Sequence, residues 1–277
     1  MSDNGKEIEK NEVKENEVQD NEEEVNEEPE KISSGKSDEP NRIILQEILQ
    51  VDCSQRYNFH FISPQILLFV AGRSFQILNL KTSQVKKIIS KSIGGIGALA
   101  IHPNKKIFAV AEKGNYPSIF VYAYPTLARL AELKGGTEKS YKHLEFSPNG
   151  DKLASLGRAP DYSLAIWDWK TEILNLKAKA FSQEVFRVSF SKFCDDVLIT
   201  SGMSHIKFWN VANTFTGLKL KGHIGKFGAV QMTDVFGFEV FPDGKVLSGS
   251  EGGDLLLWES YFVKSILRQK NGEKCHK

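Results

Sequence analysis

The sequence has few cysteines, and they lack the spacing that disulfide scaffolds and zinc sites require. The 277-residue chain contains three, Cys53, Cys194 and Cys275, which lie far apart in the sequence. Zinc sites take about four ligands, so Cys275 and the neighbouring His276 make at most half of one. This cysteine usage indicates a reducing compartment and argues against a disulfide-stabilised scaffold.

Long apolar runs are also missing. No run approaches the roughly 18–20 apolar residues that a membrane-spanning helix needs, so we expect no membrane partner. The first residues are acidic and include no apolar core of a leader, so the sequence predicts no signal peptide. Glycines in the segment 94–97 fit neither the dinucleotide fingerprint nor the phosphate-binding loop, because no helix pattern follows them. We predict a connecting loop there and no cofactor.

The sequence contains no recognisable catalytic or metal-ligating constellation. No carboxylate or cysteine recurs beside the six histidines, so we predict structural roles for them and no enzymatic activity. The histidines are His60, His102, His143, His205, His223 and His276. Four aspartates that a metal could use belong to turns or to the ends of different predicted strands, which favours solvated turn residues. They are Asp161, Asp168, Asp195 and Asp196.

Charge is divided unevenly along the chain. Residues 1–40 contain 15 Asp and Glu against 5 Lys, a net charge of −10. Residues 41–277 contain 31 Lys and Arg against 20 Asp and Glu, a net charge of +11. The first segment has too few apolar side chains to offset the entropy of folding, so we predict a disordered acidic tail over 1–40. A folded body over 41–268 and a C-terminal tail over 269–277 complete the predicted organisation.

The body repeats one pattern five times. Each repeat has an alternating segment that ends near a proline or small turn, then an apolar segment, and then an apolar segment that closes on a large residue. The closing residues are Leu78, Tyr122, Trp167, Trp209 and Trp258. Their spacings of 44, 45, 42 and 49 residues match or slightly exceed the period of about 40–45 residues of four-stranded propeller blades. The alternation of period two predicts strands.

A fourth strand is predicted at the end of each repeat. The five predicted segments are 85–89, 128–133, 173–176, 218–220 and 262–267. The segments 148–151 and 242–245 contain Asn-Gly and Asp-Gly and are typical hairpin turns.

These features resemble the WD40 repeat family. The resemblance covers about residues 55–268 and implies an all-β fold, a WD40-type β-propeller with five legible four-stranded blades that we expect to form an incomplete ring. It rests on the recurring Phe-Ser-Pro type of turn and on the pairs Trp167–Asp168, Trp209–Asn210, Trp258–Glu259 and Gly222–His223.

The sequence departs from the family pattern in its polar residues. Blades of the family often hold a buried aspartate six residues before the closing tryptophan. Asp161 stands there in the third repeat, whereas Met203 and Gly252 occupy the equivalent positions in the last two. We therefore expect these blades to depend mainly on apolar packing in place of the family's His–Ser–Asp–Trp hydrogen-bond network.

The last repeat narrows the resemblance. Residues 242–259 look like a segment of axonemal members of the family. This implies a non-enzymatic scaffold in the axoneme of the motile cilium or flagellum, part of an inner dynein arm tether that supports motility. The implied partners are other proteins, namely a sister axonemal WD-repeat protein and dynein-arm or microtubule components. Such members are longer, so the chain would be a fragment, a short isoform or an incomplete gene model. A generic cytosolic or nuclear WD40 adaptor remains the alternative.

Lysines are spread through the repeats and permit two interpretations. They could form an electrostatic face for an acidic partner, or they could keep strand edges soluble. The residues are Lys86, Lys87, Lys105, Lys106, Lys177, Lys179, Lys219, Lys221 and Lys226. Nucleic acid is not expected as a partner, because no aromatic–basic alternation appears.

The segment 43–51 bears on whether the ring closes. Its apolar residues could form an outer strand that completes the last blade of a closed ring. In the fifth repeat, however, the segment 262–267 is already a candidate for that edge. Because both segments would have to pair with the same sheet edge, we expect an open arc and not a five-bladed ring.

Overall fold

The computed structural model describes residues 51–52, 55–194, 196–215 and 217–268. The predicted tails, 1–40 and 269–277, and nearly all of the segment 43–51 lie outside these residues. Within the described ranges, twenty strands form five four-stranded antiparallel sheets, in which each strand pairs with its neighbours in the sequence. The predicted all-β fold of five four-stranded units is therefore confirmed.

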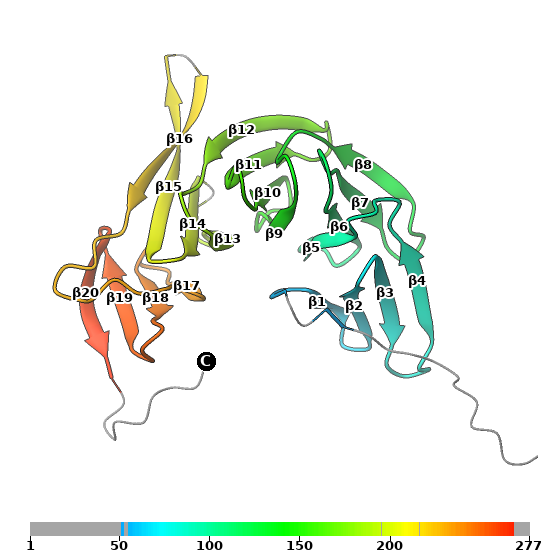
Figure 1. The fold of residues 1–277 in the computed structure, drawn as a ribbon, viewed down its shortest axis with the longest axis horizontal. Coiled ribbons are helices and arrows are strands. Elements are labelled where there is room, and N and C mark those ends of the chain that lie inside the picture. Colours follow the sequence, from blue (N-terminus) through cyan, green and yellow to red (C-terminus); the bar gives the residue numbers. More distant parts are fainter. Residues whose placement is uncertain (1–50, 53–54, 195, 216, 269–277) are drawn as a thin grey trace, which may run out of the picture. The chain divides into compact units, whose positions relative to one another are not determined.

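The sheets follow the repeats (Figure 1). The first contains β1 (Phe59–Ser63), β2 (Ile66–Ala71), β3 (Ser74–Asn79) and β4 (Val85–Ile89). The second contains β5 (Ile96–Ile101), β6 (Ile107–Glu112), β7 (Ile119–Ala123) and β8 (Arg129–Leu133). The third contains β9 (Tyr141–Phe146), β10 (Lys152–Gly157), β11 (Ser163–Asp168) and β12 (Ile173–Lys179).

The fourth sheet contains β13 (Val185–Phe190), β14 (Val197–Gly202), β15 (His205–Thr214) and β16 (Gly217–Ile224). The fifth contains β17 (Phe238–Val240), β18 (Val246–Gly249), β19 (Leu255–Glu259) and β20 (Phe262–Leu267). Strand β16 is longer than the predicted segment 218–220, because its pairing with β15 runs from Gly217 opposite Thr214 to Ile224 opposite Lys207. Strand β12 likewise runs three residues beyond the predicted end. Apolar periodicity does not mark these extensions, because their residues are mostly exposed.

The core consists of four successive interfaces between neighbouring sheets. One apolar cluster joins the first sheet to the second, and similar clusters join the second to the third, the third to the fourth and the fourth to the fifth. The middle strands are covered on both faces, which explains why their sequences are continuous apolar runs such as Ile107–Ala111. The fourth strands are exposed on alternate residues, as in β12. Each sheet is thus stabilised mainly by its neighbours, as expected for repeat architectures.

Candidate functional site

The closing tryptophans lie in the third strands and are buried. Trp167, Trp209 and Trp258 are 0%, 2% and 1% exposed. Each indole nitrogen donates a hydrogen bond to a hydroxyl group on the neighbouring second strand. The pairs are Trp167 with Ser155 (2.9 Å), Trp209 with Thr200 (2.9 Å) and Trp258 with Ser248 (2.8 Å).

These hydroxyl partners were missed by the sequence reasoning, which expected mainly apolar packing. A signal was present, because a serine or threonine precedes each tryptophan by 12, 9 and 10 residues. An unpaired buried indole N–H would cost about 1–3 kcal/mol, so each hydroxyl removes a penalty that packing alone cannot remove.

Tyr122 and Asp168 have different surroundings. Tyr122 is half-buried in β7, and its ring lies 5.5 Å from both Phe75 and Phe108 at the interface of the first two sheets. Asp168 ends β11, and its carboxylate accepts hydrogen bonds from the backbone N–H groups of Lys170 (3.1 Å) and Thr171 (3.3 Å). Asp168 therefore fixes the turn that leads into β12.

The structure does not bring the other predicted motif residues together. Asp161 accepts a hydrogen bond from the Thr137 hydroxyl (2.8 Å) within the third sheet's loops. Gly222 and His223 lie in β16 of the fourth sheet, where the imidazole stacks on the Tyr261 ring at 4.7 Å. Asp161 and His223 thus belong to different sheets, and a threonine is the hydrogen-bond partner of the aspartate.

Strands β1, β9 and β13, with the residue Tyr57 that precedes β1, bring together an inner cluster of side chains that the sequence did not predict to be neighbours. We define it as Tyr57, His60, His143, Glu145 and Arg187. The His143 ring meets the Tyr57 ring edge-on at 4.9 Å, and the Arg187 guanidinium lies 5.6 Å from the Tyr57 ring centre. The first strands of the five sheets all lie on the inner edge of the row of sheets, around a common centre (Figure 1). The cluster therefore joins residues of the first, third and fourth sheets.

Burial alters the titration of this inner cluster. It raises the pKa of Glu145 to about 7, although the Ser189 hydroxyl donates to this carboxylate (2.8 Å) and opposes the shift. Burial also lowers the pKa of His143 to about 3, and the positive charge of Arg187 adds to that shift. The pKa of His60 is lowered for the same reason, burial. At neutral pH both imidazoles are therefore uncharged.

Arg187 connects the inner cluster to the fifth sheet. Its Nη1 donates a hydrogen bond to the carbonyl oxygen of Phe238 in β17 (2.7 Å), and its guanidinium lies 4.9 Å from the Phe238 ring centre. Nearby, the Arg56 guanidinium lies 4.1 Å from the Phe236 ring centre, and Phe236 stacks on Phe186 at 4.8 Å. Two arginines thus link the segment before β1 to the fourth and fifth sheets.

A cavity of about 500 Å³ adjoins the inner cluster, lined by all five of its members and by Lys105. Among the described residues, no group of three or more His, Cys, Asp or Glu side chains is placed to hold a metal ion. In the same ranges, no helix has the length and apolar character required to cross a membrane. The cavity lining combines the carboxylate of Glu145 with the cationic side chains of Lys105 and Arg187.

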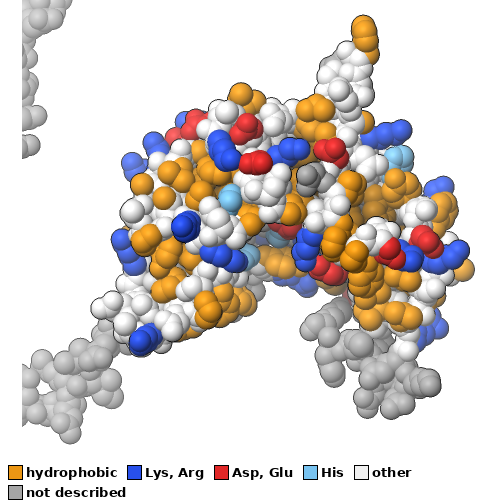
Figure 2. All heavy atoms as spheres, turned by 180° about the vertical axis from the view of Figure 1, so that it is seen from behind, with side chains coloured by type: hydrophobic (Ala, Val, Ile, Leu, Met, Phe, Trp, Pro, Cys, Tyr) orange, Lys and Arg blue, Asp and Glu red, His pale blue; other side chains and the backbone are white. Residues whose placement is uncertain are grey.

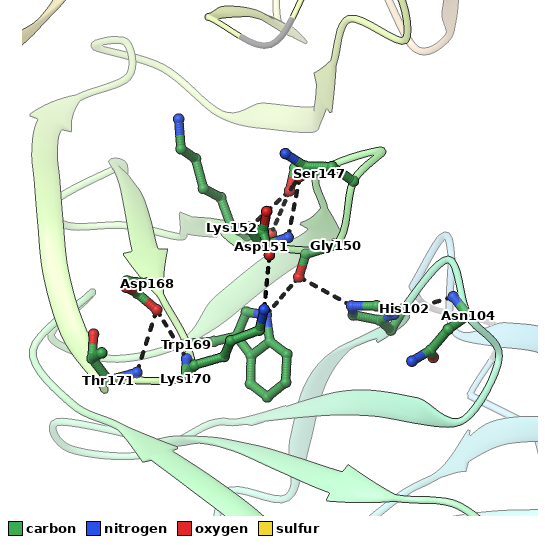
Figure 3. A network of polar contacts seen from close by, with 11 residues as sticks. His102, Asn104, Ser147, Gly150, Asp151, Lys152, Asp168, Trp169, Lys170 and Thr171 are labelled. Atoms are coloured by element: carbon green, nitrogen blue, oxygen red, sulfur yellow. Dashed lines mark hydrogen bonds and ion pairs between the residues drawn. The ribbon is translucent and has the colours of Figure 1, made fainter.

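A polar and aromatic network lies at the interface between the second and third sheets, and we call each such interface a seam (Figure 3). The Gly150 carbonyl oxygen accepts hydrogen bonds from His102 Nε2 (3.0 Å) and from Trp169 Nε1 (2.7 Å). The Asn104 backbone N–H donates to His102 Nδ1 (3.1 Å), which fixes the orientation of the ring. Trp169 is 5% exposed and packs against both His102 and Phe146. Trp169 therefore fills this seam from within.

The lysines lie largely on the outermost strands. Those of β4, β12 and β16 are exposed, which favours the interpretation that they keep sheet edges soluble. These are Lys86, Lys87, Lys177, Lys179, Lys219 and Lys221.

Exposed apolar side chains gather on the fifth sheet, toward the lower right of Figure 2. They include Phe241, Leu255, Phe262, Ile266 and Leu267. Large exposed apolar patches typically mark contacts with other proteins.

Comparison with known proteins places the sequence beside ciliary proteins. No family model matches the chain. The chain is 47% identical to "Cilia- and flagella-associated protein 44" of Mus musculus over 225 residues, which are 81% of this chain and 12% of the relative. It is 42% identical to the protein of the same name in Chlamydomonas reinhardtii over 233 residues, 82% of this chain and 13% of the relative. It is also 30% identical to human "Echinoderm microtubule-associated protein-like 4" over 183 residues, 61% of this chain and 18% of the relative. The chain thus spans about an eighth of the length of its ciliary relatives.

Proposed function

Since the chain is a WD-repeat protein homologous to Cilia- and flagella-associated protein 44, we propose that it is a non-enzymatic structural component of the axoneme. The observation that carries the proposal is the identity of 47% and 42% over four fifths of the chain with proteins of a mouse and an alga. Similarity over so large a share covers nearly all of the repeat region.

The architecture supports a binding role. Five sheets packed in succession expose loops and sheet edges while the apolar residues of the interfaces stay buried. Such surfaces suit docking of several proteins. The inner cluster adds aromatic, cationic and carboxylate groups from three sheets beside one cavity, which supports a binding role.

The finer role that we propose is part of an inner dynein arm tether that supports ciliary and sperm flagellar motility. The expected partners are a sister axonemal WD-repeat protein and dynein-arm or microtubule components. Similarity to a protein whose name includes "microtubule-associated" supports the last of these. The locations expected for the whole protein are therefore the cytoplasm and, within it, the cytoskeleton of the cilium or flagellum.

Localisation and extraction test this proposal. The endogenous protein, tagged in ciliated cells, is expected along the axoneme and should remain there after the membrane is removed with detergent. Loss of the protein is expected to reduce beating and to remove density at the base of an inner dynein arm in tomograms. A detergent-soluble pool in the cytosol or nucleus, with normal beating after its loss, would instead support a generic WD40 adaptor.

A further inference from the structure

Two seams between sheets can be compared position by position. The seam between the second and third sheets and the seam between the fourth and fifth sheets have the same backbone hydrogen bonds. The His102 N–H binds the carbonyl of Ile107, as the Ser191 N–H binds that of Val197. Strand register also agrees, because Trp167 faces Leu153 and Trp258 faces Val246. The equivalent residues are therefore His102 and Ser191, Gly150 and Gly244, and Trp169 and Ser260.

The two seams differ in what fills them. In the third sheet, Asp168 pairs with Ile173, which leaves a four-residue turn that begins with Trp169. In the fifth sheet, Glu259 pairs with Phe262, which leaves a turn of only two residues, Ser260 and Tyr261. Ser260 is exposed, and its side chain is far smaller than the indole of Trp169.

Tyr261, the large side chain of the short turn, packs against the fourth sheet and lines the space between the fourth and fifth sheets. The Tyr261 ring stacks on His223 at 4.7 Å and lies 5.3 Å from the Phe208 ring. Small residues at the positions of Ser191 and Ser260 leave a cavity of about 540 Å³ between the fourth and fifth sheets. A hollow between the fourth and fifth sheets therefore lies at the position that is equivalent to that of the Trp169 indole between the second and third sheets.

The cavity has the chemistry of an indole site. Its apolar walls come from four buried side chains, and polar groups stand among its lining residues. The apolar residues are Ile199, Phe208, Val240 and Trp258, and the polar ones include Asn210, Asp243, Lys245 and Glu259. Gly244 has a φ of +80°, as Gly150 does, and its N–H binds the carbonyl of Phe241 as the Gly150 N–H binds that of Ser147, so the two glycines hold the same turn position. At Gly150 the carbonyl oxygen accepts the indole N–H of Trp169.

We propose that the seam between the fourth and fifth sheets is a docking site for a tryptophan side chain of a partner protein. The indole would lie against Trp258 and Val240 and would donate its N–H to the Gly244 carbonyl oxygen, as Trp169 does to Gly150. Two exposed aromatic residues adjoin the site. Phe193 lines the cavity and is 53% exposed, and Phe241 directly precedes the lining residue Pro242 and is 38% exposed. They extend the apolar surface beyond one side chain, which favours a macromolecular partner. Buried aromatic anchors of this kind carry much of the energy of protein interfaces. The inference holds wherever in the cell the protein acts.

The test uses the full chain and N-acetyl-L-tryptophanamide as the probe. Titration is expected to shift the methyl resonances of Ile199 and Val240 in NMR spectra, and N-acetyl-L-leucinamide is expected to bind at least about fivefold more weakly. Ser260→Trp should fill the hollow from within and weaken binding of the tryptophan probe by more than about tenfold. Ser265→Trp on the exposed strand β20 is the matched control and should bind as the unaltered protein does. If Ser260→Trp does not fold, Glu259→Phe, at another exposed lining position, should give the same loss.

Three results would overturn the proposal. The first is the absence of shifts at Ile199 and Val240, including the case in which the chain's own residues already occupy the hollow. The second is equal binding by Ser260→Trp and the control. The third is a dimer in sedimentation equilibrium that Ser260→Trp converts to a monomer, because the occupant would then be a second copy of the chain.

Discussion

Replacement of Trp258 by alanine tests the packing between the fourth and fifth sheets most directly. The side chain is 1% exposed, its ring lies 5.0 Å from Phe227 and 6.3 Å from Phe208, and its indole N–H is bound by Ser248. A buried aromatic side chain removes about 150–250 Å² from water. At roughly 25 cal/mol per Å² this corresponds to about 4–6 kcal/mol. Alanine retains part of this burial, so we expect a loss of about 3–5 kcal/mol in the free energy of unfolding.

Two further variants separate the contributions to that loss. Ser248→Ala keeps the ring but leaves the indole N–H without its acceptor, so we expect a cost of about 1–3 kcal/mol. Phe262→Ala removes an aromatic side chain from the adjacent strand β20. Because Phe262 is 50% exposed, its loss should cost less than about 1 kcal/mol.

Urea unfolding followed by circular dichroism measures all three values. The order Trp258→Ala, then Ser248→Ala, then Phe262→Ala is the expected ranking of destabilisation. A loss below about 1 kcal/mol for Trp258→Ala would refute the reasoning, because it would mean that this residue does not close the interface between the two sheets.

Four other perturbations test the remaining conclusions. The pKa of Glu145 is about 7 in the folded chain and about 4.5 in the unfolded chain. Between these two values only the folded chain keeps the proton, so the free energy of unfolding decreases as the pH rises from about 4.5 through 7. Glu145→Gln should therefore gain stability relative to the unaltered protein over that interval, by about 1–2 kcal/mol after allowance for solvent, and a pH-independent difference in urea unfolding would contradict this. His143→Gln should remove the opposite trend, the loss of stability as the pH falls from 6.5 toward 3, with urea unfolding again the measurement. Arg187→Leu should cost about 1–3 kcal/mol and speed amide exchange in β17, since it removes the bond to Phe238, and unchanged exchange there would count against the link. In sedimentation velocity, the 277-residue chain is expected to associate through the exposed apolar side chains of the fifth sheet, and a monomer at all concentrations tested would contradict this.

The sequence by itself determined the number and order of the sheets. A tryptophan or other large residue recurred at spacings of 42–49 residues, and strands such as 85–89 and 262–267 were predicted with the bounds that the structure has. This succeeded because each repeat is a local unit in which sequence neighbours pair, so alternation and turn residues carry the information. The resemblance of residues 242–259 to axonemal proteins was also visible without a structure.

Only the tertiary structure decided which side chains meet between sheets. The hydroxyl partners of the tryptophans, the inner cluster around Arg187 and the hollow beside Trp258 all join residues that are separated by turns or by whole repeats. A difference as small as a two-residue turn in place of a four-residue turn removes one indole from a seam and opens a cavity. Such contacts follow from how neighbouring sheets pack together, and the period of a sequence does not encode that arrangement.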